Sequence, residues 1–370
     1  MPRTPPWILA AATLAGACAT PPAERPEAPA EVTAVTRPDR PGLVEGPVVL
    51  VHAGQGSPAA WSDGAVRGAE AGFDALGGGA SALAAAQAAV RVLEDDPRFN
   101  AGRGANLRLD GRVIECDAAV MDDAGRFGAV AGVDGVRHPV ELAARILGTP
   151  HLLVAGAGAN ALAVRLGLER ARLATDRARR KLVRAYRALF EGLPPGDPWA
   201  GFDWRAHWNF DTPPPATFEQ ARAQIDAAAA AAVAPAARDT VGAVVRTADG
   251  RFAAALSTGG TTLALRGRVG DVPQRGAGLF AGPFGAVAAT GRGEAIVRER
   301  VAAAVYDNLA AGMPARVAIR RAIDGIRPVE GVGVIAVSRY DHGAVATSQM
   351  AWAARGEFGT VRADEYVERW

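Results

Sequence analysis

The chain has 370 residues, and 41 Lys and Arg against 39 Asp and Glu leave a formal net charge of +2. This balance gives no basic surface of the kind that binds nucleic acid, so no nucleic-acid partner is expected. Hydrophobic residues make up 49% and charged residues 22%, which is typical of a globular protein and excludes a disordered or collagen-like chain. The length allows one large domain or two ordinary ones.

Several kinds of site are excluded by motifs that the sequence lacks. The two cysteines, Cys18 and Cys116, cannot form a disulfide framework, and neither C-x-x-C nor H-E-x-x-H is present to hold zinc. Lys181 is the only lysine, which excludes a phosphate-binding P-loop and most Schiff-base chemistry. Without a G-x-S-x-G motif, a serine-hydrolase elbow has no candidate.

Residues 1–18 predict a signal peptide. Arg3 precedes an apolar run over residues 7–17 that is shorter than the ~18 residues of a membrane-spanning helix. We therefore expect an exported protein, periplasmic or lipid-anchored in a bacterial envelope. The letters AGAC ending at Cys18 resemble a lipoprotein box, whose lipidated cysteine would attach the chain to a membrane, but Leu14 lies four places before the cysteine instead of three. An ordinary cleavage site near Cys18 is the alternative, and both remain open.

Two segments predict linkers. Residues 19–47 are rich in proline and charge and have no hydrophobic period, which indicates an extended, disordered tether. Residues 192–238 contain proline clusters and end in an alanine-rich run, which indicates an exposed, flexible linker inside one functional unit. This second segment also contains Trp199, Trp204 and Trp208, which the sequence does not explain.

The sequence between these segments predicts strands and helices in clusters. Ser81 is placed to cap one helix, Pro97 to end it, and Asp110-Gly111 to form a hairpin turn after residues 105–109. The predicted strands begin at Val48 and cover 112–120, 128–133, 152–154, 241–245, 252–256, 286–289, 332–337 and 344–348. The predicted helices cover 82–93, 139–147, 160–190, 294–308 and 315–326. Grouped strands and grouped helices indicate an α+β fold with packed sheets and helices outside.

The first half offers only weak site signals. Gly156 and Gly158 lie in a G-x-G-x-x-A run before a predicted helix, as in a dinucleotide-binding turn, but no ribose-binding acid follows at the right distance. A plain strand-to-helix turn explains the run better, so a nucleotide-dependent oxidoreductase is a distant third hypothesis. The five histidines are scattered along the sequence, and a structural role is the simplest interpretation for each.

A stronger pattern occupies the second half. Asp239-Thr240 opens a predicted strand, and STGG from Ser257, GRVGD from Gly267 and ATGRGE from Ala289 follow in order. Each motif alone is an ordinary strand start or turn. Together they place hydroxyls, glycines, an arginine and an aspartate at the ends of successive strands, where loops carry chemistry.

In this order the motifs resemble the plant-type L-asparaginase / isoaspartyl peptidase group of N-terminal-nucleophile hydrolases. The first half agrees, with LEDDPRFNAGRG from Leu93, DAAVMD from Asp117, GAVAGV from Gly128 and His138-Pro139. The resemblance runs from about Val48 to the C-terminal region and leaves out the leader, the tether and the linker. It implies a four-layer αββα sandwich and a precursor that cuts itself between Asp239 and Thr240. The products would be an α-subunit part, 48–239, and a β-subunit part, 240–370, which assemble as a dimer of cleaved αβ units.

Elementary chemistry gives a route for the cleavage that the resemblance implies. The Thr240 hydroxyl can take over the preceding acyl group, and hydrolysis of the resulting ester frees a new α-amine. An α-amine has a reference pKa near 7.7–8.0, which suits a base that works near neutral pH. One residue would then supply both nucleophile and base, so no histidine partner is needed.

The resemblance also assigns roles to other residues. It implies that a second threonine orients the nucleophile, that an arginine binds the substrate α-carboxylate, and that an aspartate binds its α-ammonium group with help from a glycine carbonyl. A threonine hydroxyl and a glycine N–H would form the oxyanion hole beside the substrate, and an asparagine would support the nucleophile. The orienting threonine is Thr258, the arginine is Arg268, the aspartate is Asp271, and the glycine that offers its carbonyl is Gly293. Thr290 and Gly291 would form the oxyanion hole, and Asn100 is the supporting asparagine.

No cofactor is expected for catalysis, but the resemblance implies a structural sodium ion. It would be held by main-chain oxygens of the loop that contains Leu93, Glu94, Asp96, Phe99, Ala101 and Arg103. A simple helix end and turn explains the same segment without a metal.

The sequence departs from the family pattern near the expected site. HAGQG at His52 stands where HGGAG is usual, and TTLAL after Gly260 replaces a more polar run. We expect a small-molecule or dipeptide substrate and a self-processing amidohydrolase that cleaves β-aspartyl (isoaspartyl) dipeptides and L-asparagine. The alternatives are a glycosylasparaginase-like hydrolase of sugar-linked asparagine, which typically has Asn in place of Gly259, and a non-catalytic, surface-tethered binding lipoprotein of the same fold.

Overall fold

The computed structural model describes residues 46–225, 240–326 and 331–363, all of which belong to one compact unit. The predicted signal peptide, Cys18 and nearly all of the tether lie outside the described residues, as does Asp239. No helix in the described ranges is long and apolar enough to cross a membrane.

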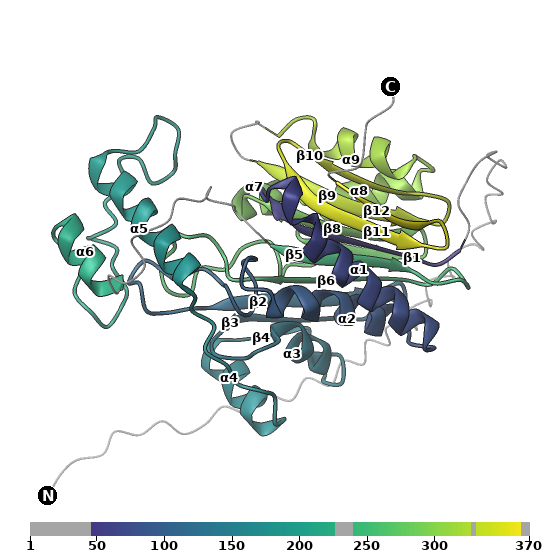
Figure 1. Cartoon of the computed structure of the whole chain (residues 1–370), viewed down its shortest axis with the longest axis horizontal. Helices are drawn as coiled ribbons and strands as arrows, with labels where there is room; N and C mark the ends of the chain where they lie inside the picture. The colour runs from purple at the N-terminus through teal and green to yellow at the C-terminus, as the bar shows by residue number, and fades with distance from the viewer. Residues whose placement is uncertain (1–45, 226–239, 327–330, 364–370) are drawn as a thin grey trace, which may run out of the picture. The chain divides into compact units, whose positions relative to one another are not determined.

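An eight-stranded sheet forms the centre of this unit, in the order β12-β11-β1-β5-β6-β2-β3-β4 (Figure 1). Every pair is antiparallel except β3 and β4. The strands are β1 (Val48–Gln55), β2 (Cys116–Asp122), β3 (Phe127–Val133), β4 (Leu153–Ala155), β5 (Val241–Arg246), β6 (Phe252–Thr258), β11 (Met350–Gly356) and β12 (Gly359–Arg362). Strands β1, β5 and β6 are buried along their whole length, which explains why their sequences are apolar or small on both faces.

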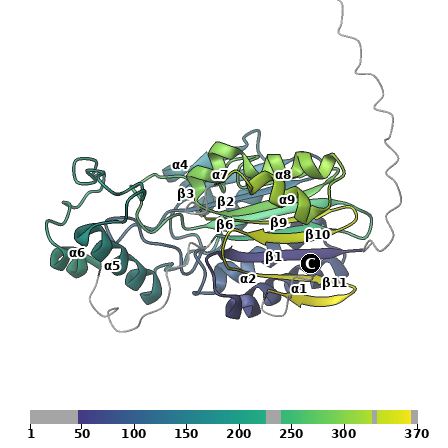
Figure 2. The same ribbon diagram turned by 90° about the horizontal axis from the view of Figure 1, so that it is seen from above.

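A second, four-stranded sheet has the order β10-β9-β8-β7; β9 and β10 are labelled in Figure 2. Its strands are β7 (Leu279–Gly282), β8 (Gly285–Gly291), β9 (Val332–Ser338) and β10 (His342–Ala346). One apolar cluster joins the two sheets: Leu50 and Val244 of the large sheet pack with Ala288 and Ile335 of the small one.

Helices cover the remaining faces of the two sheets. Helices α1 (Ser62–Gly77) and α2 (Ala82–Asp95) share a core with β1, β5 and β6, and α3 (Pro139–Ile146) and α4 (Gly156–Arg165) share one with β3. Helices α8 (Val301–Ala310) and α9 (Ala315–Ile323) pack on the small sheet, and a short 3-10 turn, η1 (Ala59–Trp61), precedes α1. The predicted α+β class is therefore confirmed.

The predicted cap of α2 is present, since the Ser81 side chain accepts a hydrogen bond from the Ala84 N–H at 3.3 Å. The hairpin prediction was wrong in one part. The turn at Asp110-Gly111 is formed, because Arg108 N donates to Val113 O at 2.8 Å, but residues 105–109 are not a strand and the strand predicted over 112–120 begins only at Cys116.

Two predicted long helices are each divided in two. The helix expected over 160–190 is α4 followed by α5 (Asp176–Glu191), because Gly167 adopts a φ of 68° and Thr175 caps a new helix. The helix expected over 294–308 is α7 (Gly293–Glu299) followed by α8, with Arg300 between them at a φ of 49°. Such left-handed residues interrupt a helix because its repeating dihedrals are right-handed.

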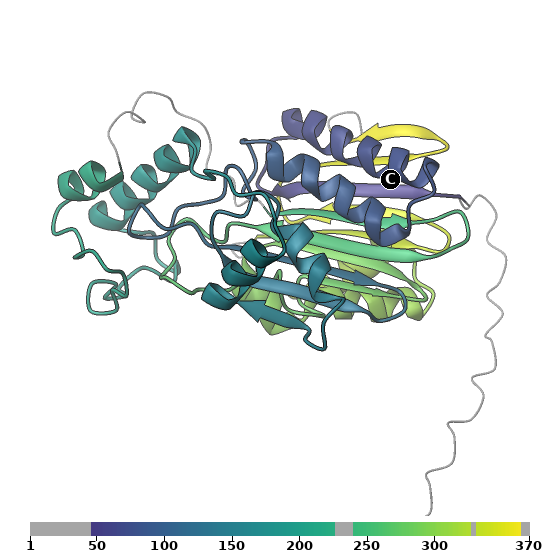
Figure 3. The same ribbon diagram turned by 90° about the horizontal axis from the view of Figure 1, so that it is seen from below.

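Residues 192–225, inside the predicted linker, carry helix α6 (Phe218–Ile225), which lies beside α5 (Figure 3). Trp204 is buried and makes edge-to-face contacts with the rings of Tyr186 and Phe190 on α5. This aromatic cluster explains the tryptophans, since it attaches the segment to α5. The predicted flexibility of the whole linker stays a prediction, because residues 226–238 lie outside the described part.

Close packing of α1 on its neighbours gives a test of the fold. A Cβ at Gly72 would lie 2.9 Å from Val49 Cγ1 and 3.0 Å from the carbonyl oxygen of Ala85, whereas one at Gly77 would meet nothing within 4 Å. We expect Gly72→Leu to lower the free energy of unfolding in urea by about 1–3 kcal/mol through overpacking. Gly77→Leu, in the same helix, should stay within about 0.5 kcal/mol of wild type. Equal effects of the two substitutions would contradict this packing.

Candidate active site

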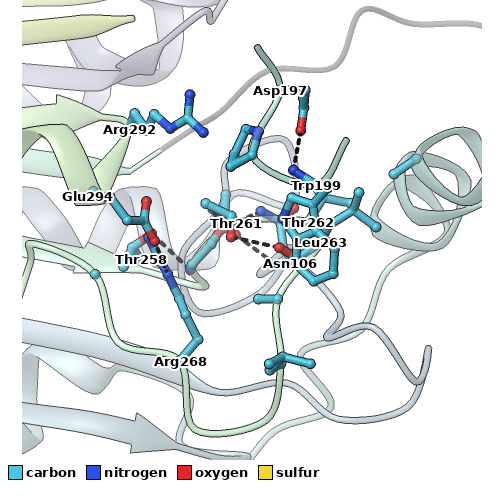
Figure 4. Close-up of a pocket in the computed structure, with 18 of the residues that line it drawn as sticks. Asn106, Asp197, Trp199, Thr258, Thr261, Thr262, Leu263, Arg268, Arg292 and Glu294 are labelled. Atoms are coloured by element: carbon cyan, nitrogen blue, oxygen red, sulfur yellow. Dashed lines mark hydrogen bonds and ion pairs between the residues drawn. The ribbon is translucent and has the colours of Figure 1, made fainter. Parts of the chain in front are cut away.

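A pocket of about 1320 Å³ opens beside the ends of β5, β6 and β8 (Figure 4). It brings together most of the site residues predicted from both halves of the sequence. These lining residues are Asn100, Thr240, Thr258, Arg268, Asp271, Gly291 and Gly293. Thr290 is not among them: it is fully buried, and its hydroxyl accepts a hydrogen bond from Gln55 N at 3.1 Å.

Sheet pairing positions the two threonines. Thr240 directly precedes β5, Thr258 ends β6, and the pairing of Val241 with Ser257 sets the two ends opposite each other. Thr240 Oγ1 donates to Thr258 Oγ1 at 3.2 Å, and both side chains are buried. Thr258 Oγ1 also accepts from Gly260 N at 3.1 Å, so the turn after β6 fixes its position.

Two asparagines hold this turn in place. Asn100 Nδ2 donates to Gly260 O at 2.7 Å and Asn106 Nδ2 donates to the same oxygen at 2.6 Å. Asn106 N in turn donates to Asn100 Oδ1 at 2.7 Å. A Cβ at Gly259 would lie 2.5 Å from Asn100 Oδ1, so only glycine fits there. The support predicted for Asn100 therefore has a visible geometry, while Asn106 carried no sequence signal of its own.

Arg268, Asp271 and Gly293 converge at the start of α7. A Cβ at Gly293 would lie 2.7 Å from Arg268 Nη2 and 3.0 Å from Asp271 Oδ1. Glu294 had no predicted role. Its carboxylate atom Oε1 accepts hydrogen bonds from two atoms of Arg268, Nη2 at 2.7 Å and Nε at 3.0 Å (Figure 4). The guanidinium group is thus oriented by an ion pair at the pocket wall.

The main chain of Arg268 is held by a second arginine that the sequence did not indicate. Arg108 is fully buried and donates from Nε to Glu115 Oε2 at 2.9 Å and from Nη2 to the carbonyl oxygen of Arg268 at 3.1 Å. Glu115 Oε2 also accepts from Gly267 N at 2.8 Å. This buried ion pair fixes the GRVGD loop against the strand that follows Glu115.

The Asp271 carboxyl group is electrostatically unusual. Burial raises the pKa of Asp271 to about 7, and the positive charge of Arg268 opposes that rise only in part. Within the described residues, Asp271 Oδ2 is buried without a hydrogen-bond partner. A buried, unpartnered carboxylate oxygen costs free energy that a cation bound beside it would recover. The site therefore suits an ammonium group.

His52 lies close to Thr240 but is unsuited to act as a base for it. Its ring packs against the main chain of β5, where a Cβ at Gly242 would lie 2.5 Å from Nε2. Burial lowers the pKa of His52 to about 3. A group that weakly basic cannot accept the proton of Thr240 efficiently near neutral pH.

The loop predicted to bind sodium has main-chain carbonyl oxygens close to its glycines, the kind of donor that such an ion would need. Carbonyl oxygens crowd its two glycines: a Cβ at Gly102 would lie 2.7 Å from Glu94 O, and one at Gly104 would lie 2.5 Å from Phe99 O. Glu94 O accepts a hydrogen bond from Arg103 N at 2.7 Å, so one of the two lone pairs of this oxygen remains available to a cation. Hard cations prefer oxygen donors of this kind. In the described part of the chain, no cluster of three or more His, Cys, Asp or Glu side chains could hold a metal ion.

Comparison with known proteins identifies the family. A family model described as Asparaginase matches residues 49–363. The plant-type L-asparaginase of Pyrobaculum calidifontis is 35% identical over 286 residues, which cover 75% of this chain and 84% of the relative. The isoaspartyl peptidase/L-asparaginase of Danio rerio is 32% identical over 342 residues (87% and 97%), and that of Rattus norvegicus is 31% identical over 323 residues (83% and 85%). The chain belongs to the asparaginase family, as the resemblance predicted, and this family has the N-terminal-nucleophile hydrolase fold.

The raised pKa of Asp271 predicts a pH-dependent stability. The unfolded carboxyl group releases its proton near pH 4, whereas the native group keeps it to about pH 7. The native state therefore binds more protons in this window, and the stability of the wild type falls as the pH rises through it. Relative to Asp271→Asn, we expect this loss in urea titrations to reach at most about 1.4 kcal/mol per pH unit between pH 4 and 7.

Asp74→Asn, at an exposed position on α1, is the control for the loss of a carboxylate. Its stability should follow that of the wild type across the same pH range. Curves for Asp271→Asn and the wild type that run parallel would contradict the assignment.

Proposed function

We propose that the chain is a self-processing amidohydrolase that cleaves β-aspartyl (isoaspartyl) dipeptides and L-asparagine through Thr240. Membership of the asparaginase family and the names of its relatives support an amidohydrolase of this kind. The observation that carries the proposal is the 3.2 Å hydrogen bond between the Thr240 and Thr258 hydroxyls, inside a pocket that also holds Arg268 and Asp271.

The first step is the cleavage of the chain between Asp239 and Thr240. The Thr240 hydroxyl oxygen attacks the carbonyl carbon of Asp239, the peptide C–N bond breaks, and the acyl group becomes an ester. Water then cleaves the ester, giving the Asp239 carboxylate, the Thr240 hydroxyl and a free Thr240 α-amine. The buried position of Thr240 at the start of β5 supports this role, because it fixes the hydroxyl against Thr258.

Substrate binding uses the groups that converge on α7. The Arg268 guanidinium is suited to bind the substrate α-carboxylate through two parallel hydrogen bonds. The unpartnered Asp271 oxygen binds the α-ammonium group, and the Gly293 carbonyl oxygen is the predicted second acceptor. The side-chain amide of the substrate would then lie toward Thr240, since all three groups line the same pocket.

Amide hydrolysis follows the same chemistry as self-cleavage. The Thr240 α-amine accepts the hydroxyl proton while the oxygen attacks the side-chain amide carbon. Collapse of the tetrahedral intermediate passes the proton to the leaving amine and gives a β-aspartyl ester, which water hydrolyses. The weak basicity of His52 supports the α-amine as the base.

The developing oxyanion would be stabilised by the Gly291 N–H and the Thr290 hydroxyl. Each donor of this type typically contributes ~2.7–4 kcal/mol to lowering the barrier. Gly291 has a φ of 137°, and a Cβ there would lie 2.1 Å from the carbonyl oxygen of Gly331, so this main-chain orientation requires glycine. Thr290 already accepts from Gln55 N, which leaves its own O–H as a donor.

The proposal includes the four-layer αββα sandwich. Its support is the order of the apolar clusters: α1 and α2 with the large sheet, the large sheet with the small one, and the small sheet with α8 and α9.

We also propose a structural sodium ion on the loop from Leu93 to Arg103, where its charge would hold the turn that carries Asn100. Removal of sodium should then lower the melting temperature.

The envelope location and the assembly remain part of the proposal. A signal peptide over residues 1–18 would export the chain to the periplasm, either free or anchored through lipidated Cys18. The native mass of the processed protein tests the predicted dimer of cleaved αβ units, and labelling with a radioactive fatty acid tests lipidation.

The alternative of a glycosylasparaginase-like hydrolase is disfavoured by one contact. Those enzymes typically have asparagine where this chain has Gly259, and a Cβ at Gly259 would lie 2.5 Å from Asn100 Oδ1 and from Ala105 Cβ. The position therefore has no room for a side chain.

Replacement of the nucleophile tests the proposed chemistry. We expect Thr240→Ala to abolish both chain cleavage and β-aspartyl hydrolysis, because it removes the only atom assigned to attack either amide. Denaturing gels should show one uncut chain, and an amine-release assay should show background rates.

The matched control is Thr360→Ala in β12, outside the pocket, which should process and hydrolyse like the wild type. A Thr240→Ala protein that still hydrolyses β-aspartyl dipeptides would refute the nucleophile. A wild type that neither cuts itself nor hydrolyses any of these substrates would favour the non-catalytic binding lipoprotein.

The planar guanidinium group of Arg268 gives a second prediction. Arg268→Lys keeps the positive charge but loses the paired hydrogen bonds to a carboxylate. We expect KM for a β-aspartyl dipeptide to rise roughly 10-fold or more, which corresponds to about 1.4 kcal/mol, with a smaller change in kcat. Steady-state kinetics checks this result, and an unchanged KM would show that Arg268 does not bind the substrate.

A further inference from the structure

The pocket extends well beyond the corner that would hold an aspartyl group. Its volume of about 1320 Å³ exceeds the ~300–1,000 Å³ of typical small-molecule sites. Arg268, Asp271 and Gly293 line one side, while α5 and the segment after it supply another wall, including Ala188 and Trp199. The space between these walls is available to the group that leaves during hydrolysis.

Positive charge lines both walls of this space. Lys181 and Arg184 of α5 line one wall, Arg292 and Arg298 line the other beside Gly291 and Gly293, and Asp197 is an acidic residue of the same pocket. Two other cations of the pocket form ion pairs: Arg268 with Glu294 at 2.7 Å and Arg266 with Asp211 at 2.9 Å. In the described part of the chain, neither Arg184 nor Arg292 forms a salt bridge, and both side chains are half-buried.

Arg292 is placed directly beside the reacting groups. It lies between Gly291 and Gly293, and its main chain is fixed because its N–H donates to Gly331 O at 3.0 Å and its carbonyl accepts from Ala295 N at 3.0 Å. Its side chain extends into the pocket, apart from the Arg268–Glu294 pair (Figure 4). Arg292 therefore presents its guanidinium group to the same pocket that Thr240 and Thr258 line.

Arg184 reaches the pocket from a rigid support. Helix α5 is attached to the rest of the unit by Tyr186, which is buried and donates from its hydroxyl to the carbonyl oxygen of Leu109. The ring of Tyr186 also makes an edge-to-face contact with Trp204, which adds to the attachment of the helix. A cation on such a helix keeps its position, which lowers the entropy lost when it binds an anion.

We propose that Arg292 and Arg184 bind the carboxylate of the amino acid that leaves, so that the enzyme prefers β-aspartyl dipeptides with a free C-terminus. This inference rests on the proposed function. In such a dipeptide the α-carboxylate of the second residue lies one carbon from the nitrogen of the cleaved bond, within reach of a guanidinium next to Gly291. Guanidinium groups bind carboxylates through paired, charge-assisted hydrogen bonds. L-Asparagine releases ammonia, which has no such group to recognise.

The test compares two substrates that differ only in this charge: β-aspartyl-leucine and β-aspartyl-leucinamide. For the processed wild type we expect kcat/KM to be about 10-fold or more higher for the acid than for the amide, the size of one charge-assisted hydrogen bond. Arg292→Gln and Arg184→Gln should each lower this acid-to-amide ratio at least threefold. Added NaCl should lower the ratio as well, because salt screens the attraction.

Arg187→Gln is the control for a lost charge on the same helix, since Arg187 is exposed and does not line the pocket. Its acid-to-amide ratio should equal that of the wild type. Variants of Arg292 and Arg184 that lose activity equally on both substrates would show a structural role and overturn the inference.

Two further outcomes separate this inference from the function on which it rests. If the wild type hydrolyses the acid and the amide equally well, the carboxylate site is refuted and the amidohydrolase stands. If the processed wild type hydrolyses no β-aspartyl substrate, the proposed function fails and the carboxylate site fails with it.

Discussion

The antiparallel pairing of β5 with β1 and β6 is the constraint on which the rest of the site depends. It places Thr240, at the start of β5, against Thr258, at the end of β6, with their hydroxyl oxygens 3.2 Å apart. Three fully buried strands hold this geometry, so the hydroxyl of Thr240 has little freedom. If Thr240 acts as the proposed nucleophile, a hydroxyl fixed in this way loses little further entropy when it attacks an amide.

Near Thr240 and Thr258, carboxyl groups are buried at a cost in free energy. Asp271 and Asp117 are both buried, and burial raises their pKa values to about 7 and about 6. Asp117 Oδ1 accepts from Gly132 N at 2.9 Å, but in the described residues neither Asp117 Oδ2 nor Asp271 Oδ2 has a hydrogen-bond partner. Perturbed carboxyl groups next to a fixed arginine are typical of sites that bind a charged ligand. The free energy cost of burying the Asp271 carboxyl group can be recovered when an ammonium group binds beside it.

Much of the fold and part of the site could be predicted from the sequence, for physical reasons. Buried central strands such as β5 have apolar runs, and Ser81 has an unambiguous capping position. The short strand β7 and the interruption at Arg300 were missed, because neither changes the local hydrophobic pattern. The motifs around Thr258 and Arg268 were visible in the sequence. Asn106 and Arg108 were not, since their importance lies in contacts with residues far along the chain.

Sequencing of the N-termini during activation tests the central claim most directly. Freshly synthesised chain is incubated, and the appearance of an N-terminus at Thr240 is followed together with the hydrolysis of β-aspartyl-leucine. We expect activity to rise in proportion to the fraction of chains that begin at Thr240. Full activity in chains that remain intact across residues 239 and 240 would contradict it, because Thr240 would then have no α-amine to act as its base.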